Sequence, residues 1–167
     1  MADKAKGKVS ASILTDNVKS KMSGSLDSGD VSLDVGTGEG WVYVKRNITT
    51  TSATLLSTSD DFFGGHEKSD EAGSLSTSDK IKWICIKNTG KGSNGTSTSE
   101  SVMFCLDGGT AAYGIGDGIL LNSGECCILK PINTTINDLT IITTSSGGSS
   151  AGTGEVVVEV AAVIQNI

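Results

Sequence analysis

His66 is the only histidine in the chain, and it lies in the acidic segment DDFFGGHEKSDE at residues 60–71. The carboxylates of this segment are Asp60, Asp61, Glu67, Asp70 and Glu71. Such a group could hold a divalent cation, since Ca²⁺ takes about 6–8 oxygen ligands around a turn, or it could serve a hydrolase. The spacing of an EF-hand loop is absent, so we expect a solvated acidic loop without a metal. An enzyme is the least favoured hypothesis.

Other sequence patterns give little support for catalysis. Serine is abundant enough for a Ser-His-Asp triad, but no G-x-S-x-G segment is present to expose a nucleophile. The glycine-rich segments at 35–40 and 114–118 lack both the G-x-G-x-x-G pattern and a Walker lysine, so we interpret them as turns. A carboxylate pair of the glycosidase type stays open, because any two strands can bring Asp and Glu together. We predict no catalytic residue, no cofactor and no metal site.

Four cysteines are present, none of them in a CxxC pair: Cys85, Cys105, Cys126 and Cys127. With one histidine in the chain, a structural zinc site has little support. Cys126 and Cys127 are adjacent, so they would point to opposite faces of an extended strand. We expect reduced thiols that act as small apolar side chains on strands.

The charge of the chain is unevenly distributed. The net charge is -6, yet Lys4, Lys6, Lys8, Lys19 and Lys21 against two aspartates give the first 21 residues +3, which leaves -9 for the rest. An acidic body argues against a nucleic-acid partner, because phosphate binding relies on Lys and Arg. We interpret residues 1–24 as a basic N-terminal arm that contacts a partner, with a solvated, frayed terminus as the alternative. No segment has the ~20 apolar residues of a membrane span, so we expect no membrane partner.

Short apolar runs separated by turn signals dominate the remaining sequence. We predict strands at 31–35, 41–48, 80–88, 101–107, 118–121, 125–130, 138–144 and 155–164. We expect the segment NTGKGSNGTSTSE at 88–100 to form an exposed hairpin loop and LNSGE at 121–125 to form a tight hairpin turn with Gly124 at positive φ. The pattern predicts an all-β fold: one antiparallel, jelly-roll-like β-sandwich over 25–167. Residues 49–79 form a long excursion with at most one short strand or helical turn.

Two of the predicted strands repeat one pattern, WVYVK at 41–45 and WICIK at 83–87. Both alternate so that each face is apolar, and a second apolar face needs a cover, for which an oligomer neighbour is one solution. We expect Ile81, Trp83 and Cys85 on one face, with Ile84 and Ile86 on the other. The predicted interface residues are Lys4, Lys6, Lys8, Trp41, Tyr43, Trp83, Ile84 and Ile86. The tetrapeptide STSD also occurs twice, at 57–60 and 76–79.

The second half of the chain carries a series of strand and turn motifs. They are W-I-x-I-K-N at 83–88, L-D-G-G at 106–109, I-L-L-N-S-G-E-x-x-I-L at 119–129, D-L-T-I-I-T-T at 138–144 and E-V-V-V-E-V at 155–160. Over roughly residues 80–164 this series resembles the small β-sandwich virion proteins of tailed bacteriophages, in particular capsid decoration (cement) proteins. The resemblance implies a non-enzymatic structural protein on the capsid surface, made in the host cytoplasm and bound to the major capsid protein or another virion protein. It also implies a homo-oligomer, with a trimer favoured.

A second hypothesis is a tail, baseplate or fibre accessory protein with a glycan-binding sandwich. Trp41 and Trp83 would then stack on sugar rings, and the Gly/Ser/Thr-rich loops would surround them. Burial of both tryptophans would remove the aromatic platform that this hypothesis requires.

Overall fold

The computed structural model describes residues 37–62, 73–111 and 118–167. These residues belong to one compact unit, Val35–Ile167. The predicted arm at 1–24, with Lys4, Lys6 and Lys8, lies outside the described residues, as do the strand at 31–35 and His66 with its neighbours Glu67, Asp70 and Glu71. The limits of the arm and of the domain therefore stay predictions.

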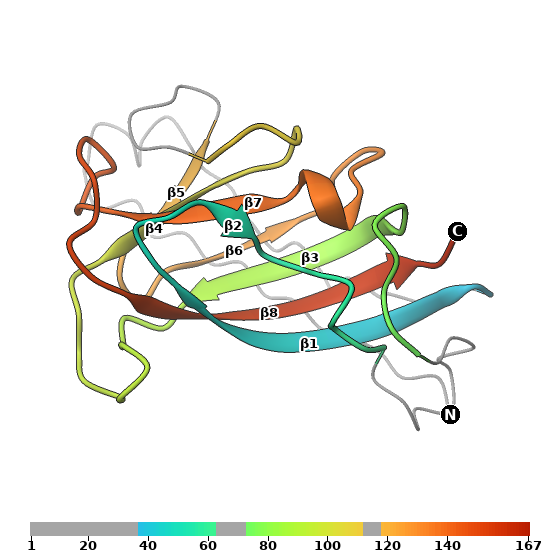
Figure 1. Ribbon diagram of the computed structural model, residues 1–167, viewed down its shortest axis with the longest axis horizontal. Coiled ribbons are helices and arrows are strands. Elements are labelled where there is room, and N and C mark those ends of the chain that lie inside the picture. Colours follow the sequence, from blue (N-terminus) through green and yellow to red (C-terminus); the bar gives the residue numbers. More distant parts are fainter. Residues whose placement is uncertain (1–36, 63–72, 112–117) are drawn as a thin grey trace, which may run out of the picture. The chain divides into compact units, whose positions relative to one another are not determined.

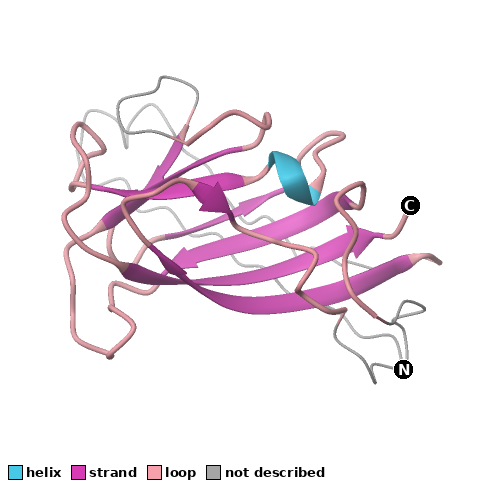
Figure 2. Cartoon of the chain, viewed as in Figure 1, coloured by secondary structure: helices cyan, strands magenta, loops and turns pink. Residues whose placement is uncertain are grey.

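Eight strands form two antiparallel four-stranded sheets (Figures 1 and 2). Sheet A has the order β1 (Glu39–Ile48), β8 (Val156–Gln165), β3 (Lys80–Asn88), β6 (Cys126–Leu129). Sheet B has the order β2 (Ala53–Thr54), β7 (Thr140–Thr144), β4 (Ser101–Cys105), β5 (Ile119–Leu121). One 3-10 turn, η1 (Ile136–Asp138), precedes β7.

The order of the strands identifies the architecture. Strands that follow one another in the sequence lie in different sheets, except β4 and β5, which are neighbours in sheet B. Two four-stranded sheets interleaved in this way are the arrangement of an eight-stranded jelly roll. The predicted all-β, jelly-roll-like sandwich is confirmed.

The two predicted hairpins are wrong, because both connections cross from one sheet to the other. Residues 89–100 join β3 in sheet A to β4 in sheet B, and residues 122–125 join β5 in sheet B to β6 in sheet A. Gly124 does adopt the expected positive φ of 83°. A tight turn reverses the chain locally, but it leaves open which strand the chain then pairs with.

Asn88, the last residue of β3, links the two connections that cross between the sheets. Its side chain is fully buried, and Nδ2 donates to the carbonyl oxygens of Glu100 and Leu121, at 3.0 and 3.2 Å. Its Oδ1 accepts from the N–H of Gly90 at 2.9 Å, and its own N–H donates to the carbonyl of Glu125. One side chain at the end of β3 therefore satisfies backbone groups of both sheet-crossing connections.

The core lies between the inner faces of the two sheets. Alternate residues of β8 supply its centre, from Val156 to Ile164, and each of these five side chains is fully buried. Val102 and Phe104 of β4 and Ile141 of β7 pack into the same cluster from sheet B. The period-2 alternation of the sequence is what places these side chains on a single face.

The excursion at 49–79 contributes to this core. Its described part contains the short strand β2, and its apolar side chains Leu55, Leu56, Phe62 and Leu75 are all buried. The two STSD copies form the same turn: Ser57 N–H donates to the carboxylate of Asp60, and Ser76 N–H donates to that of Asp79, at 2.8 and 2.7 Å. The repeated tetrapeptide therefore encodes a repeated turn.

One predicted orientation in β3 is wrong. A β-bulge between Ile81 and Trp83 inserts Lys82 as an extra residue opposite β8. Ile81 is buried with Ile84 and Ile86, whereas Trp83 and Cys85 lie on the opposite, partly exposed face. A single extra residue moves every side chain before it to the other face of the sheet.

Candidate functional site

The outer face of sheet A is the candidate functional site, and β8 runs along its centre. β8 lies between β1 and β3 and is antiparallel to both, so the two repeated strands point in the same direction on either side of it (Figure 1). Residues at equivalent positions of the two repeats pair with the same residue of β8. The two copies of the repeated sequence therefore flank β8 in the same register.

The first row of this face is aromatic. Trp41 and Trp83 both pair with Val163, one from each side, and both are partly buried. Their ring centroids are 5.8 Å apart and their planes meet at 77°, which is an edge-to-face arrangement. Such aromatic pairs add about 0.5–1.5 kcal/mol beyond the area that they bury. We name Trp41, Val163 and Trp83 the aromatic row.

The next row is uncharged and more exposed. Tyr43 and Cys85 both pair with Ala161, and Ile128 of β6 pairs with Cys85. Tyr43 is 49% exposed and Ile128 is 37% exposed, and they are two of four large hydrophobic side chains found exposed among the described residues. We name Tyr43, Ala161, Cys85 and Ile128 the middle row.

The third row carries charge. Lys45 and Lys87 both pair with Glu159, and their Nζ atoms lie 2.9 and 3.9 Å from its carboxylate oxygens. The hydrogen bond from Lys45 is the main cause that holds the pKa of Glu159 below its usual value, and the same bond raises the pKa of Lys45. The lysine side chains remain 59% and 53% exposed. We name Lys45, Glu159 and Lys87 the charged row.

The outer face of sheet B differs from that of sheet A because its own chain covers it. All five residues of β4 are buried, including the outward-facing Met103 and Cys105. Gly148 approaches Met103 and Leu120 so closely that an added Cβ would lie 3.0 and 3.1 Å from their methyl groups. Within the described part of the chain, the exposed apolar sheet surface is therefore that of sheet A.

The predicted interface residues that lie in the described part of the chain separate into two groups. Trp41, Tyr43 and Trp83 lie together on the outer face of sheet A. Ile84 and Ile86 do not, because they are fully buried in the core and present no surface to a partner. The period-2 alternation of β3 already separated them from Trp83, so a single interface could not have contained all three.

The sequence-based site omitted several residues of this face. Lys45, Lys87, Glu159 and Ile128 were not among the predicted interface residues. The two lysines had a usable signal, since each occupies the same place in the repeated pentapeptide. No signal in the sequence pointed to Glu159 or Ile128, because their positions on this face depend on which strands pair.

The cysteines all lie on strands, and they form no disulfide with one another. Cys126 is exposed, whereas its neighbour Cys127 is partly buried and packs against the core, so the two point to opposite faces as predicted. Burial raises the pKa of Cys127 to about 11 and also raises the pKa of Cys85.

Asp60, the first carboxylate of the acidic segment, forms an ion pair with Arg46. Asp60 is buried, and Arg46 Nη2 lies 2.5 Å from both of its carboxylate oxygens. Across the described residues, no group of three or more His, Cys, Asp or Glu side chains is placed to hold a metal ion.

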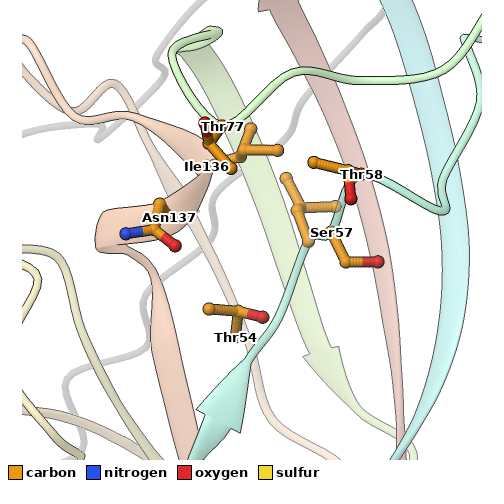
Figure 3. A pocket seen from close by; sticks show the side chains of 7 residues that line it. Thr54, Ser57, Thr58, Thr77, Ile136 and Asn137 are labelled. Atoms are coloured by element: carbon orange, nitrogen blue, oxygen red, sulfur yellow. The ribbon is translucent and has the colours of Figure 1, made fainter.

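A small pocket of about 140 Å³ lies where three turns meet (Figure 3). It is lined by Thr54, Leu56, Ser57, Thr58, Thr77, Ile136 and Asn137. The third turn repeats the STSD geometry, since Thr135 N–H donates to the carboxylate of Asp138 at 2.8 Å. The lining side chains offer hydroxyl, amide and apolar groups, none of which titrates near neutral pH.

No protein-family model matches the chain, and no curated protein sequence matches it. Among solved structures, the coat protein of Tobacco streak virus aligns over 81% of this chain and 91% of its own, with 9% identity and a TM-score of 0.41. The capsid asymmetric unit of cyanophage Pam1 aligns over 87% of this chain and 100% of its own, with 15% identity and a TM-score of 0.32. Because both TM-scores and both identities are low, these similarities support no statement about the function of this chain. In the described segments, no helix is both long and apolar enough to cross a membrane.

Proposed function

We propose that this chain is a non-enzymatic virion structural protein, and specifically a capsid decoration (cement) protein that bridges neighbouring capsid subunits. The observation that carries the proposal is the exposed outer face of sheet A, where aromatic, aliphatic and cationic side chains lie in rows on a regular sheet. Large exposed apolar groups rimmed by polar ones are typical of protein–protein interaction sites.

The fold and the sequence resemblance support the same proposal. Jelly rolls occur in viral capsid proteins, lectins and cupins, so the fold is compatible with a capsid role without assigning it. The motifs at 80–164 resemble those of phage virion proteins. The partner would be the major capsid protein or another virion protein, and the resemblance favours a trimer on the capsid surface, with neither nucleic acid nor membrane as partner.

Thermal unfolding of capsids tests this proposal. Particles assembled without the chain should gain several degrees in melting temperature when the purified full-length protein is added. Tyr43→Asp should abolish the gain, because it introduces a charge into the middle row. Ser149→Asp is the matched control, since it adds the same charge at an exposed position in the loop between β7 and β8. A protein that is monomeric and leaves the melting temperature unchanged would contradict the proposal.

Glycan binding by a tail, baseplate or fibre protein is the second candidate. It is favoured by the partial exposure of Trp41 and Trp83 beside the exposed Tyr43. The edge-to-face contact of the two indoles works against it, because the rings do not share one plane on which a sugar could stack. A glycan array with the native protein and with Trp41→Ala and Trp83→Ala separates the two: signals lost in both variants would favour glycan binding over assembly.

A further inference from the structure

We propose that the outer face of sheet A packs on the same face of a second copy of this chain, with the strands of the two copies reversed. The twofold axis would run across the strands, over the middle row. This inference rests on the proposed function, in that it takes this face to be the surface on which copies of the chain assemble, and it adds the geometry. Capsid subunits would then be contacted by other surfaces of the assembled protein.

The order of the rows carries the inference. Along β1 and β3 the aromatic row comes first, the middle row second and the charged row third. A twofold axis over the middle row reverses this order in the second copy. Trp41 then faces Lys45 of the second copy, and Trp83 faces Lys87 of the second copy. A twofold interface requires such self-complementarity, because each contact occurs twice.

The facing groups are chemically complementary. A lysine ammonium is attracted to the face of an indole ring, and the attraction increases as the pair loses water. Both lysines keep more than half of their side-chain surface exposed, so they remain accessible to a partner. Glu159 lies between them and would face Val163 of the second copy, so it would keep its ion pairs within its own chain.

The middle row would lie on the axis and meet itself. Tyr43 would face Tyr43 of the second copy, and Ile128 would face Ile128 of the second copy. These two side chains are the exposed large hydrophobic ones of this row. Their mutual burial supplies the apolar centre that interfaces usually have, with the charged row at the rim.

The alternative twofold arrangement is unfavourable. If the axis ran along the strands instead, each row would face itself, and the lysine pair of one copy would lie on the lysine pair of the other. Like charges placed opposite one another are destabilising. Of the two arrangements, the reversed one avoids this repulsion.

The size of the face suits a weak but specific contact. β1 and β8 have ten residues each, β3 has nine and β6 has four, so a strand spacing of about 4.8 Å and a rise of about 3.3 Å per residue give roughly 500 Å² per copy. About 1,000 Å² in total is typical of weak, transient contacts. The pair should therefore form in a concentration-dependent manner. A twofold contact is compatible with the trimer favoured above if six copies assemble.

Site-directed cross-linking tests the geometry in the full-length chain. In a Cys85→Ser, Cys126→Ser background, Tyr43→Cys would place a thiol on the axis, and a short bismaleimide should yield a covalent dimer of 34.0 kDa, twice 17.0 kDa. Lys45→Cys is the matched variant on the same strand, and its two thiols would be about 13 Å apart along the strands, so it should cross-link poorly. Mixing a Trp41→Cys chain with a Lys45→Cys chain should restore cross-linking.

Equal cross-linking by Tyr43→Cys and Lys45→Cys would overturn the proposal. Native mass spectrometry separates this failure from that of the proposed function. A dimer or hexamer that dissociates with Tyr43→Asp but not with Ser149→Asp supports the inference. A trimer of 51.0 kDa, three times 17.0 kDa, that is unaffected by Tyr43→Asp overturns the inference and leaves the proposed function standing. A monomer at all concentrations contradicts the twofold contact and weighs against the assembly role.

Discussion

Trp41 and Trp83 meet edge to face, 5.8 Å apart, although β8 separates their strands in the sheet. Both side chains reach over Val163 from opposite sides. The contact links the edge strand β1 to β3 across the strand between them. It therefore stabilises the surface on which the proposed interfaces depend.

Removing either tryptophan should destabilise the fold moderately. Because both rings are partly buried, we expect Trp41→Ala and Trp83→Ala each to lower the free energy of unfolding by about 1–3 kcal/mol. The loss in free energy of unfolding in the double variant should be smaller than the sum of the two single losses, by about 0.5–1.5 kcal/mol. The reason is that the ring contact is already absent when the second tryptophan is removed. Urea unfolding of the four proteins measures this. Strict additivity would contradict an energetic role for the contact.

Acid should weaken the charged row. The pKa of Glu159 is lowered from 4.5, mainly by the hydrogen bond from Lys45. A carboxyl with a lowered folded-state pKa contributes stability above its unfolded pKa, and this contribution is lost as the pH falls through the folded value. The native protein should therefore lose more stability than Glu159→Gln between about pH 5 and about pH 3. Parallel pH profiles of the two proteins from urea unfolding would contradict this.

Asn88 should be among the least replaceable polar residues. Asn88→Ala leaves the carbonyls of Glu100 and Leu121 and the N–H of Gly90 without their side-chain partner, inside the protein. We expect a loss of about 3 kcal/mol, since each unsatisfied buried group costs about 1–3 kcal/mol. Asn47 lies one residue before the end of β1 and is exposed, so Asn47→Ala should cost under about 1 kcal/mol. Thermal unfolding of both variants provides the comparison, and equal losses would refute it.

Thiol alkylation should distinguish the adjacent cysteines. Cys126 is exposed, whereas burial raises the pKa of Cys127 to about 11. At about pH 8 only about one in a thousand Cys127 side chains would be thiolate, which is the reactive form. Iodoacetamide followed by peptide mass spectrometry should find Cys126 modified well before Cys127. The difference should disappear in denaturant.

The sequence by itself determined the all-β class and most strand positions. The predicted strand at 80–88 coincides with β3, and those at 41–48 and 155–164 differ from β1 and β8 by one or two residues at an end. Alternation also placed Trp41 and Tyr43 on one face of β1. These features are local, because strand propensity and period-2 burial depend on neighbours in the sequence.

The tertiary structure alone decided which strands lie side by side. Nothing local could predict that β8, at the end of the chain, would separate the two repeated strands and bring Glu159 between Lys45 and Lys87. The bulge that moves Ile81 into the core and the change of sheet after residues 122–125 were equally invisible. Strand pairing joins residues far apart in the chain, so its register is set by the packing of the whole core and not by any single segment.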